Sequence, residues 1–183
     1  MAAFWIKLAE GIDRLNERIG KTISWLNFLL MLLVCFDVIN RYLFNYTASW
    51  INELEWHFFA LIFLLGAGFA FKNDQHVRVD LFYTNFTEKD KARVNFWGSL
   101  VFLLPWSFLL CYFAFSFAWE SYLDGEISAE PGGLPARFII KFAIVAGLFL
   151  LFLQGVATLI HSLNTMLKKE PDDLEITANH KAN

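Results

Sequence analysis

The sequence predicts an all-α integral membrane protein with four transmembrane helices, an N-terminal amphipathic interfacial helix and both termini in the cytoplasm. Composition supports this class, because 57% of the 183 residues are hydrophobic and only 18% are charged, whereas a soluble domain carries about a quarter charged residues. The apolar residues are also gathered into four long blocks, and the basic residues are concentrated between alternate blocks.

The four apolar blocks span residues 22–44, 50–71, 94–119 and 138–161, which together define a transmembrane domain over 22–166. Each block has about 20 residues or more, and at about 1.5 Å per residue it can cross a hydrocarbon core of about 30 Å. In lipid, only helices and closed barrels satisfy every backbone polar group. The blocks lack the two-residue alternation of barrel strands, so we predict four helices.

Lysine and arginine determine the predicted orientation. Twelve of the 15 basic residues lie before the first block, between the second and third, or after the fourth. The segment 45–49 has none, and the loop after the third block has only Arg137. Basic loops stay on the cytoplasmic side of a membrane, so both termini are predicted to be cytoplasmic.

Residues 1–21 have the periodicity of an amphipathic helix. Apolar residues recur there at spacings of three and four, and charged residues occupy the other positions; the apolar set is Phe4, Trp5, Leu8, Ile12, Leu15 and Ile19. Beside a transmembrane span, such a helix is expected to lie in the inner headgroup region. The alternative is that it packs on a soluble partner. At the other end, residues 167–183 form a polar tail predicted to be cytoplasmic and disordered.

Three local patterns refine the helices. Thr87 is followed by Asp90 in the manner of a capping box, which predicts that the third helix begins in the cytosol, ahead of its membrane stretch. Pro105 is expected to kink that helix. Gln154 lies between Gly147 and Gly155, and such a glycine-lined face predicts a close contact with another helix.

Ionisable residues near the outer ends of the first two helices are candidates for a polar clasp. Asp37 and Arg41 are four residues apart and share a helix face, and Glu53 and Glu55 begin the second helix a short hairpin away. Arg41 is expected to pair with Asp37, Glu53 or Glu55, fixing the hairpin or docking a partner. The alternative is that these side chains simply extend to the lipid surface.

No enzyme chemistry is predicted. The sequence has no motif for phosphate binding, metal ligation or a catalytic nucleophile, and its net charge of -3 gives no reason to expect a nucleic-acid partner. Haem would need two facing histidines, whereas His57 is predicted near the outer end of its span and His161 at the inner end of its span. We therefore predict no cofactor. A membrane anchor of a respiratory dehydrogenase or reductase remains the competing four-helix hypothesis.

Short motifs at the helix ends carry a family resemblance. They are Asn40-Arg41-Tyr42-x-Phe44, then Trp50-x-x-Glu53, then His76-x-x-Val79-Asp80. In this order, with four spans and inside termini, the chain resembles the small, DctQ-like membrane subunit of tripartite ATP-independent periplasmic (TRAP) transporters over about residues 23–161. The amphipathic segment and the tail lie outside the resemblance.

The resemblance implies a multi-pass protein of the bacterial inner membrane that forms a heterodimer with a large membrane subunit. That subunit carries an organic acid, of the C4-dicarboxylate or sialic acid type, inward on a sodium gradient after a periplasmic binding protein delivers it. The small subunit is expected to brace the large one without a transport site of its own. We predict subunit-interface or structural roles for Asp37, Asn40, Arg41, Trp50, Glu53, His76 and Asp80.

Two expectations remain alternatives at this point. The acidic outer loop would contact the binding protein through Glu126 and Glu130, or would simply be solvated. His76 and Asp80 would either cap the turn after the second helix or touch the partner subunit.

Overall fold

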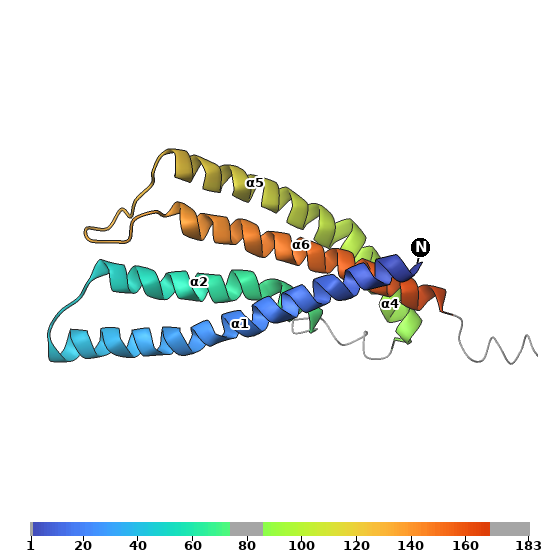
Figure 1. Ribbon diagram of the computed structural model, residues 1–183, viewed down its shortest axis with the longest axis horizontal. Coiled ribbons are helices and arrows are strands. Elements are labelled where there is room, and N and C mark those ends of the chain that lie inside the picture. Colours follow the sequence, from blue (N-terminus) through green and yellow to red (C-terminus); the bar gives the residue numbers. More distant parts are fainter. Residues whose placement is uncertain (1, 74–85, 169–183) are drawn as a thin grey trace, which may run out of the picture.

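The computed structural model describes residues 2–73 and 86–168, and all regular structure within these ranges is helical (Figure 1). The elements are α1 (Ala2–Leu43), α2 (Ser49–Lys72), α4 (Glu88–Gly98), the π-helical turn η1 (Ser99–Leu103), α5 (Leu104–Leu123) and α6 (Phe138–Leu167). Four continuous helices are long and apolar enough to cross a membrane: Ala3–Leu43, Ser49–Lys72, Glu88–Leu123 and Phe138–Leu167. The predicted all-α class and its four long apolar helices are confirmed.

Helix α6 is the central element of the bundle. Helices α1 and α2 form one hairpin, α5 and α6 form a second, and α6 also contacts α1, α2 and α4 (Figure 1). Several of its buried positions are small residues, at which neighbouring helices approach closely. The buried residues of α6 are Ile140, Gly147, Leu150, Gln154, Gly155, Ala157 and Ser162. Small side chains permit such close packing inside a membrane, where burial of apolar area alone does not drive helix association.

The glycine-lined face predicted around Gln154 is observed. A Cβ atom on Gly147 would lie 2.5 Å from the carbonyl oxygen of Leu64, so α2 and α6 touch through backbone atoms there. A Cβ on Gly155 would lie 3.0 Å from Leu103, in the π-helical turn that precedes α5. The two glycines therefore set the distances from α6 to its neighbours on two sides.

Helix α1 differs from the sequence expectation in its extent. The predicted amphipathic segment and first span are one unbroken helix of 42 residues with no end near residue 21. Its N-terminal half crosses the C-terminal half of α6 (Figure 1), where Ala9 and Ile12 pack against Ala157. Of the apolar face predicted over residues 1–21, Ile12 packs against α6, whereas Phe4, Trp5, Leu8 and Leu15 are exposed.

The third membrane helix begins before its apolar stretch, as predicted. Thr87 is its N-cap, and the side-chain oxygen of Thr87 accepts a hydrogen bond from the Asp90 backbone N–H at 3.2 Å. A π-helical turn lies just before Pro105, where the sequence predicted a kink. Because proline lacks an N–H, the preceding turn loses a backbone hydrogen bond. The Ser107 hydroxyl donates to the carbonyl of Leu103, the last residue of that turn, at 2.5 Å.

Large apolar side chains cover the outside of the bundle. Phe63, Phe102, Phe108 and Tyr112 are each about two-thirds exposed, and fully buried hydrophobic residues are few. A soluble protein rarely exposes so large a contiguous apolar surface. Contact with hydrocarbon explains it, in keeping with four helices that can span a bilayer.

Candidate functional site

The predicted clasp at the outer ends of α1 and α2 divides into two separate clusters. In the first, Arg41 forms an ion pair with Asp37, which is 3% exposed. Glu55 lies near enough to both to interact electrostatically. Asn40 terminates α1, because its carbonyl oxygen accepts from the backbone N–H groups of Phe44 and Tyr46 at 3.1 and 3.2 Å. These contacts hold the end of the helix and the first residues of the turn.

Glu53 forms the second cluster and does not pair with Arg41. Its side chain is buried beneath the loop that joins α5 to α6. One carboxylate oxygen accepts a hydrogen bond from the Ser128 hydroxyl, and the other accepts from the Leu134 backbone N–H at 2.5 Å. Glu53 therefore attaches the α1–α2 hairpin to the α5–α6 hairpin at the ends predicted to be outer. Its neighbour Trp50 is 39% exposed in the first turn of α2.

Glu126 is engaged within the chain. Its carboxylate forms an ion pair with Lys141, accepts from the Ser121 hydroxyl at 2.6 Å and lies 3.8 Å from Arg137. It thereby joins the last turn of α5 to the first turn of α6. Glu130 is exposed, and its backbone N–H donates to the Ser128 hydroxyl at 3.1 Å. Glu126 and Glu130, which were predicted together as a contact for the binding protein, thus have different surroundings.

This arrangement predicts an acid-sensitive outer loop. The hydrogen bond from Lys141, followed by that from Ser121, lowers the pKa of Glu126. A carboxyl whose pKa is lower in the folded state stabilises the fold above the usual glutamate range, and that contribution disappears as the pH falls through the folded pKa. We expect hydrogen exchange in residues 124–137 to accelerate below about pH 4, and the Glu126→Gln variant to show a smaller change over this range. An identical pH profile for the variant would contradict this assignment.

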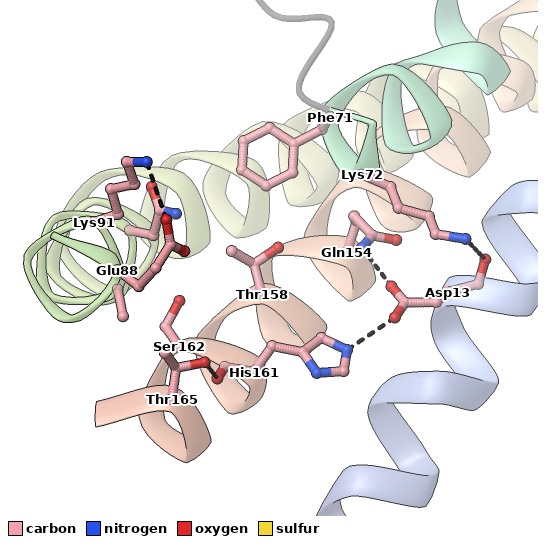
Figure 2. A pocket seen from close by; sticks show the side chains of 12 residues that line it. Asp13, Phe71, Lys72, Glu88, Lys91, Gln154, Thr158, His161, Ser162 and Thr165 are labelled. Carbon is pink, nitrogen blue, oxygen red and sulfur yellow. Dashed lines mark hydrogen bonds and ion pairs between the residues drawn. The ribbon is translucent and has the colours of Figure 1, made fainter. Parts of the chain in front are cut away.

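A third polar cluster joins α1 to α6 at the opposite end of the bundle. Asp13 accepts a hydrogen bond from Gln154 Nε2 at 2.7 Å, and its other oxygen lies 2.8 Å from His161 Nε2 (Figure 2). Gln154 Oε1 in turn accepts from Asn16 Nδ2 at 2.8 Å. Asn16 and Gln154 are almost fully buried, at 0% and 2% exposure. Breaking these buried hydrogen bonds would be costly, so the network favours one register of α1 on α6.

Helix α2 joins the same cluster through Lys72. The Lys72 ammonium donates to the Asp13 carbonyl oxygen at 3.3 Å and to Glu17 Oε2 at 2.8 Å. Lys21 donates to the other Glu17 oxygen at 2.6 Å. At the end of the bundle predicted to be inner, α1, α2 and α6 are therefore held by one connected set of hydrogen bonds.

Beside this network lies an open cavity of about 500 Å³ between α1, α2, α4 and α6. Its wall carries both charge signs, from Asp13 and Glu88 and from Lys72 and Lys91, together with the hydroxyl groups of α6 (Figure 2). Lys91 and Glu88 are themselves paired at 3.0 Å.

This inner network was not predicted from the sequence. Its signal was Asn16, which falls on the same helical stripe as Ala9 and Ile12, a position where a polar residue needs a partner. His76 and Asp80, predicted as site residues, lie outside the described residues. Within the described ranges, no three His, Cys, Asp or Glu side chains gather as a metal site would require.

The comparisons with known proteins agree on one family. Residues 30–165 match the family model described as "Tripartite ATP-independent periplasmic transporters, DctQ component". The chain is also 27% identical over 121 residues to a TRAP transporter small permease protein of Haemophilus influenzae, covering 66% of this chain and 72% of the relative. No solved structure is significantly similar to this chain.

Proposed function

This chain belongs to the DctQ component family of tripartite ATP-independent periplasmic transporters, and on that premise we propose that it braces the large membrane subunit. The resemblance noted from the helix-end motifs is thereby confirmed, and the chain is a transport component, not an enzyme. It is a multi-pass membrane protein that associates with other components of the transporter. The family match over most of the chain leaves the respiratory-anchor hypothesis without support.

The location of the buried polar side chains supports a bracing role most directly. In the described part of the chain, hydrogen-bonded clusters link different helices at both ends of the bundle. The network around Asp13 lies at one end, and the clusters of Glu53 and Glu126 lie at the other. Between them, α2 and α6 are in backbone contact at Gly147. A frame fixed at both ends and in the middle resists deformation, as a fixed element beside a moving one must.

The proposed orientation follows the distribution of charge. Basic residues dominate the segments at the inner-network end of the bundle, so we assign this end and both termini to the cytoplasm. Glu53 and the loop 124–137 then face the periplasm, where a binding protein would deliver the substrate. Glu130, as the exposed member of the acidic pair, is the better candidate for that contact.

The proposed transport reaction is sodium-driven uptake of an organic acid by the large subunit. Reconstitution tests it: liposomes containing the large subunit are supplied with the binding protein and a sodium gradient, with or without this chain. We expect uptake of the delivered acid, a sialic acid or C4-dicarboxylate being tried first, only when the chain is present. Equal uptake without it would refute the bracing role.

Arg41 offers a residue-level test of the same proposal. Replacing Arg41 with alanine leaves the buried Asp37 carboxylate without its charge partner, which is typically costly by about 3 kcal/mol or more for a buried pair and by less here because Arg41 is half exposed. We expect Arg41→Ala to reduce co-purification of the large subunit several-fold, with little change in the substrate affinity of the assembled complex. Arg93→Ala is the control, because Arg93 pairs, among the described residues, with an exposed aspartate at the other end.

Normal co-purification by the Arg41→Ala variant would contradict a role for this cluster in assembly. Reduced recovery with both variants would point instead to a general effect of lost positive charge.

A further inference from the structure

Four basic side chains on the N-terminal half of α1 form a continuous stripe, which we call the basic stripe: Lys7, Arg14, Arg18 and Lys21. At about 100° of rotation per residue, these positions fall within an arc of about 60° on the helix surface. All four side chains are exposed. The stripe therefore faces away from the buried positions that pack against α6.

The opposite side of the same helix is already occupied. Ala9, Ile12 and Asn16 are buried against α6, and Asp13 is bonded to Gln154 and His161. These contacts fix the rotation of α1 about its axis. As a result, the basic stripe cannot turn inward, and it is presented outward along the inner end of the bundle.

Exposed apolar side chains run beside the basic stripe. Phe4 is 66% exposed, and Leu8 and Leu15 are about 40% exposed, on the adjoining arc of α1. An outward surface that combines a cationic row with an apolar row matches the headgroup region of a bilayer, where phosphates and acyl chains meet.

The charges on the stripe are only partly neutralised within the chain. Arg14 has Glu10 at 3.7 Å, and Lys21 has Glu17 at 2.6 Å. Glu17 is shared with Lys72, so it does not balance Lys21 alone. In the described part of the chain, Lys7 and Arg18 have no acidic partner within ion-pair distance. Positive charge therefore remains for a ligand outside the protein.

We propose that the basic stripe binds the headgroups of anionic phospholipids and so selects them over zwitterionic lipids beside α1. A row of cations held at headgroup level attracts anionic lipid, with each lysine or arginine contributing a factor of about five. Because α1 is bonded to α6 and α2 at this level, lipid held there would anchor the inner end of the whole bundle. The proposal adds a lipid specificity that the bracing role does not require, so its failure would leave that role intact.

Electron paramagnetic resonance tests it with the full chain reconstituted in phosphatidylcholine bilayers. Spin-labelled phosphatidylglycerol and phosphatidylcholine are compared for their association with the protein. We expect the wild-type chain to prefer phosphatidylglycerol, and the preference to fall about fivefold or more in the Lys7→Gln, Arg18→Gln double variant. These two residues are exposed and have no ion-pair partner among the described residues, so the helix content of the variant should be unchanged. Salt at about 1 M should weaken the wild-type preference, because it shortens electrostatic range to about 3 Å.

Two further variants make the assignment to this stripe specific. Glu10→Gln frees Arg14 from its acidic neighbour and should increase the preference for phosphatidylglycerol, while Arg93→Gln, outside the stripe, should leave it unchanged. An equal loss in the Arg93 variant, or no loss in the double variant, would overturn the proposal. It would also be overturned if assembly with the large subunit abolished the preference, since the stripe would then be a protein interface.

Discussion

Replacing Gly147 with alanine is expected to separate α2 from α6 and to destabilise the bundle by roughly 1–3 kcal/mol. The added Cβ would lie 2.5 Å from the Leu64 carbonyl oxygen and 2.8 Å from the Leu64 carbonyl carbon. Both are backbone atoms, so no side-chain rotation relieves the overlap. Thermal unfolding of the detergent-solubilised chain, followed by circular dichroism, measures the loss.

Gly66→Ala is the matched control, because a Cβ on Gly66 would meet no atom within 4 Å. Alanine is the better helix former, so this variant should be as stable as the wild type or up to about 1 kcal/mol more stable. Equal destabilisation by both substitutions would show that the α2–α6 backbone contact is not what makes Gly147 necessary.

Removal of the Glu53 carboxylate is expected to release the outer loop from α2. In Glu53→Ala, the Leu134 N–H and the Ser128 hydroxyl lose their acceptors beneath the loop. A buried donor left without an acceptor costs about 1–3 kcal/mol. We therefore expect the Leu134 amide to exchange at least about ten times faster, with exchange also faster across residues 124–137.

The exposed Glu130 supplies the control for this prediction. Its side chain is solvent-exposed in the same loop, so Glu130→Ala should leave exchange at Leu134 unchanged. Glu53→Gln should lie between the two, because an amide retains one acceptor oxygen but presents an N–H group to the other donor. Wild-type protection of Leu134 in Glu53→Ala would contradict the attachment described here.

The outer loop shows how similar residues acquire different roles. The sequence does not distinguish Glu126 from Glu130, since both are acidic residues in a turn-rich loop. The fold places the first between Lys141 and Ser121 and leaves the second in solvent. Which of them can contact another protein depends on how the loop between α5 and α6 folds back onto these helices. Local sequence does not encode this arrangement.

Much of the architecture followed directly from the amino-acid order. Long apolar blocks must become helices in lipid because no other open structure satisfies their backbone groups, and the four helices match those blocks to within a few residues at most ends. The start of the third helix at Thr87 was equally local, because an N-cap depends on its own next three residues. The helix-end motifs were sufficient to identify the family.

Only the tertiary structure decided which polar side chains meet. Of its three predicted acidic partners, Arg41 pairs with Asp37, the one on its own helix. Glu53 instead contacts a loop more than 70 residues away in the sequence. Asp13 contacts Gln154 and His161 only because α1 continues unbroken and crosses α6. Helix formation depends on neighbours within a few residues, but these pairings depend on rotation and crossing between helices. Close contacts such as that at Gly147 determine both.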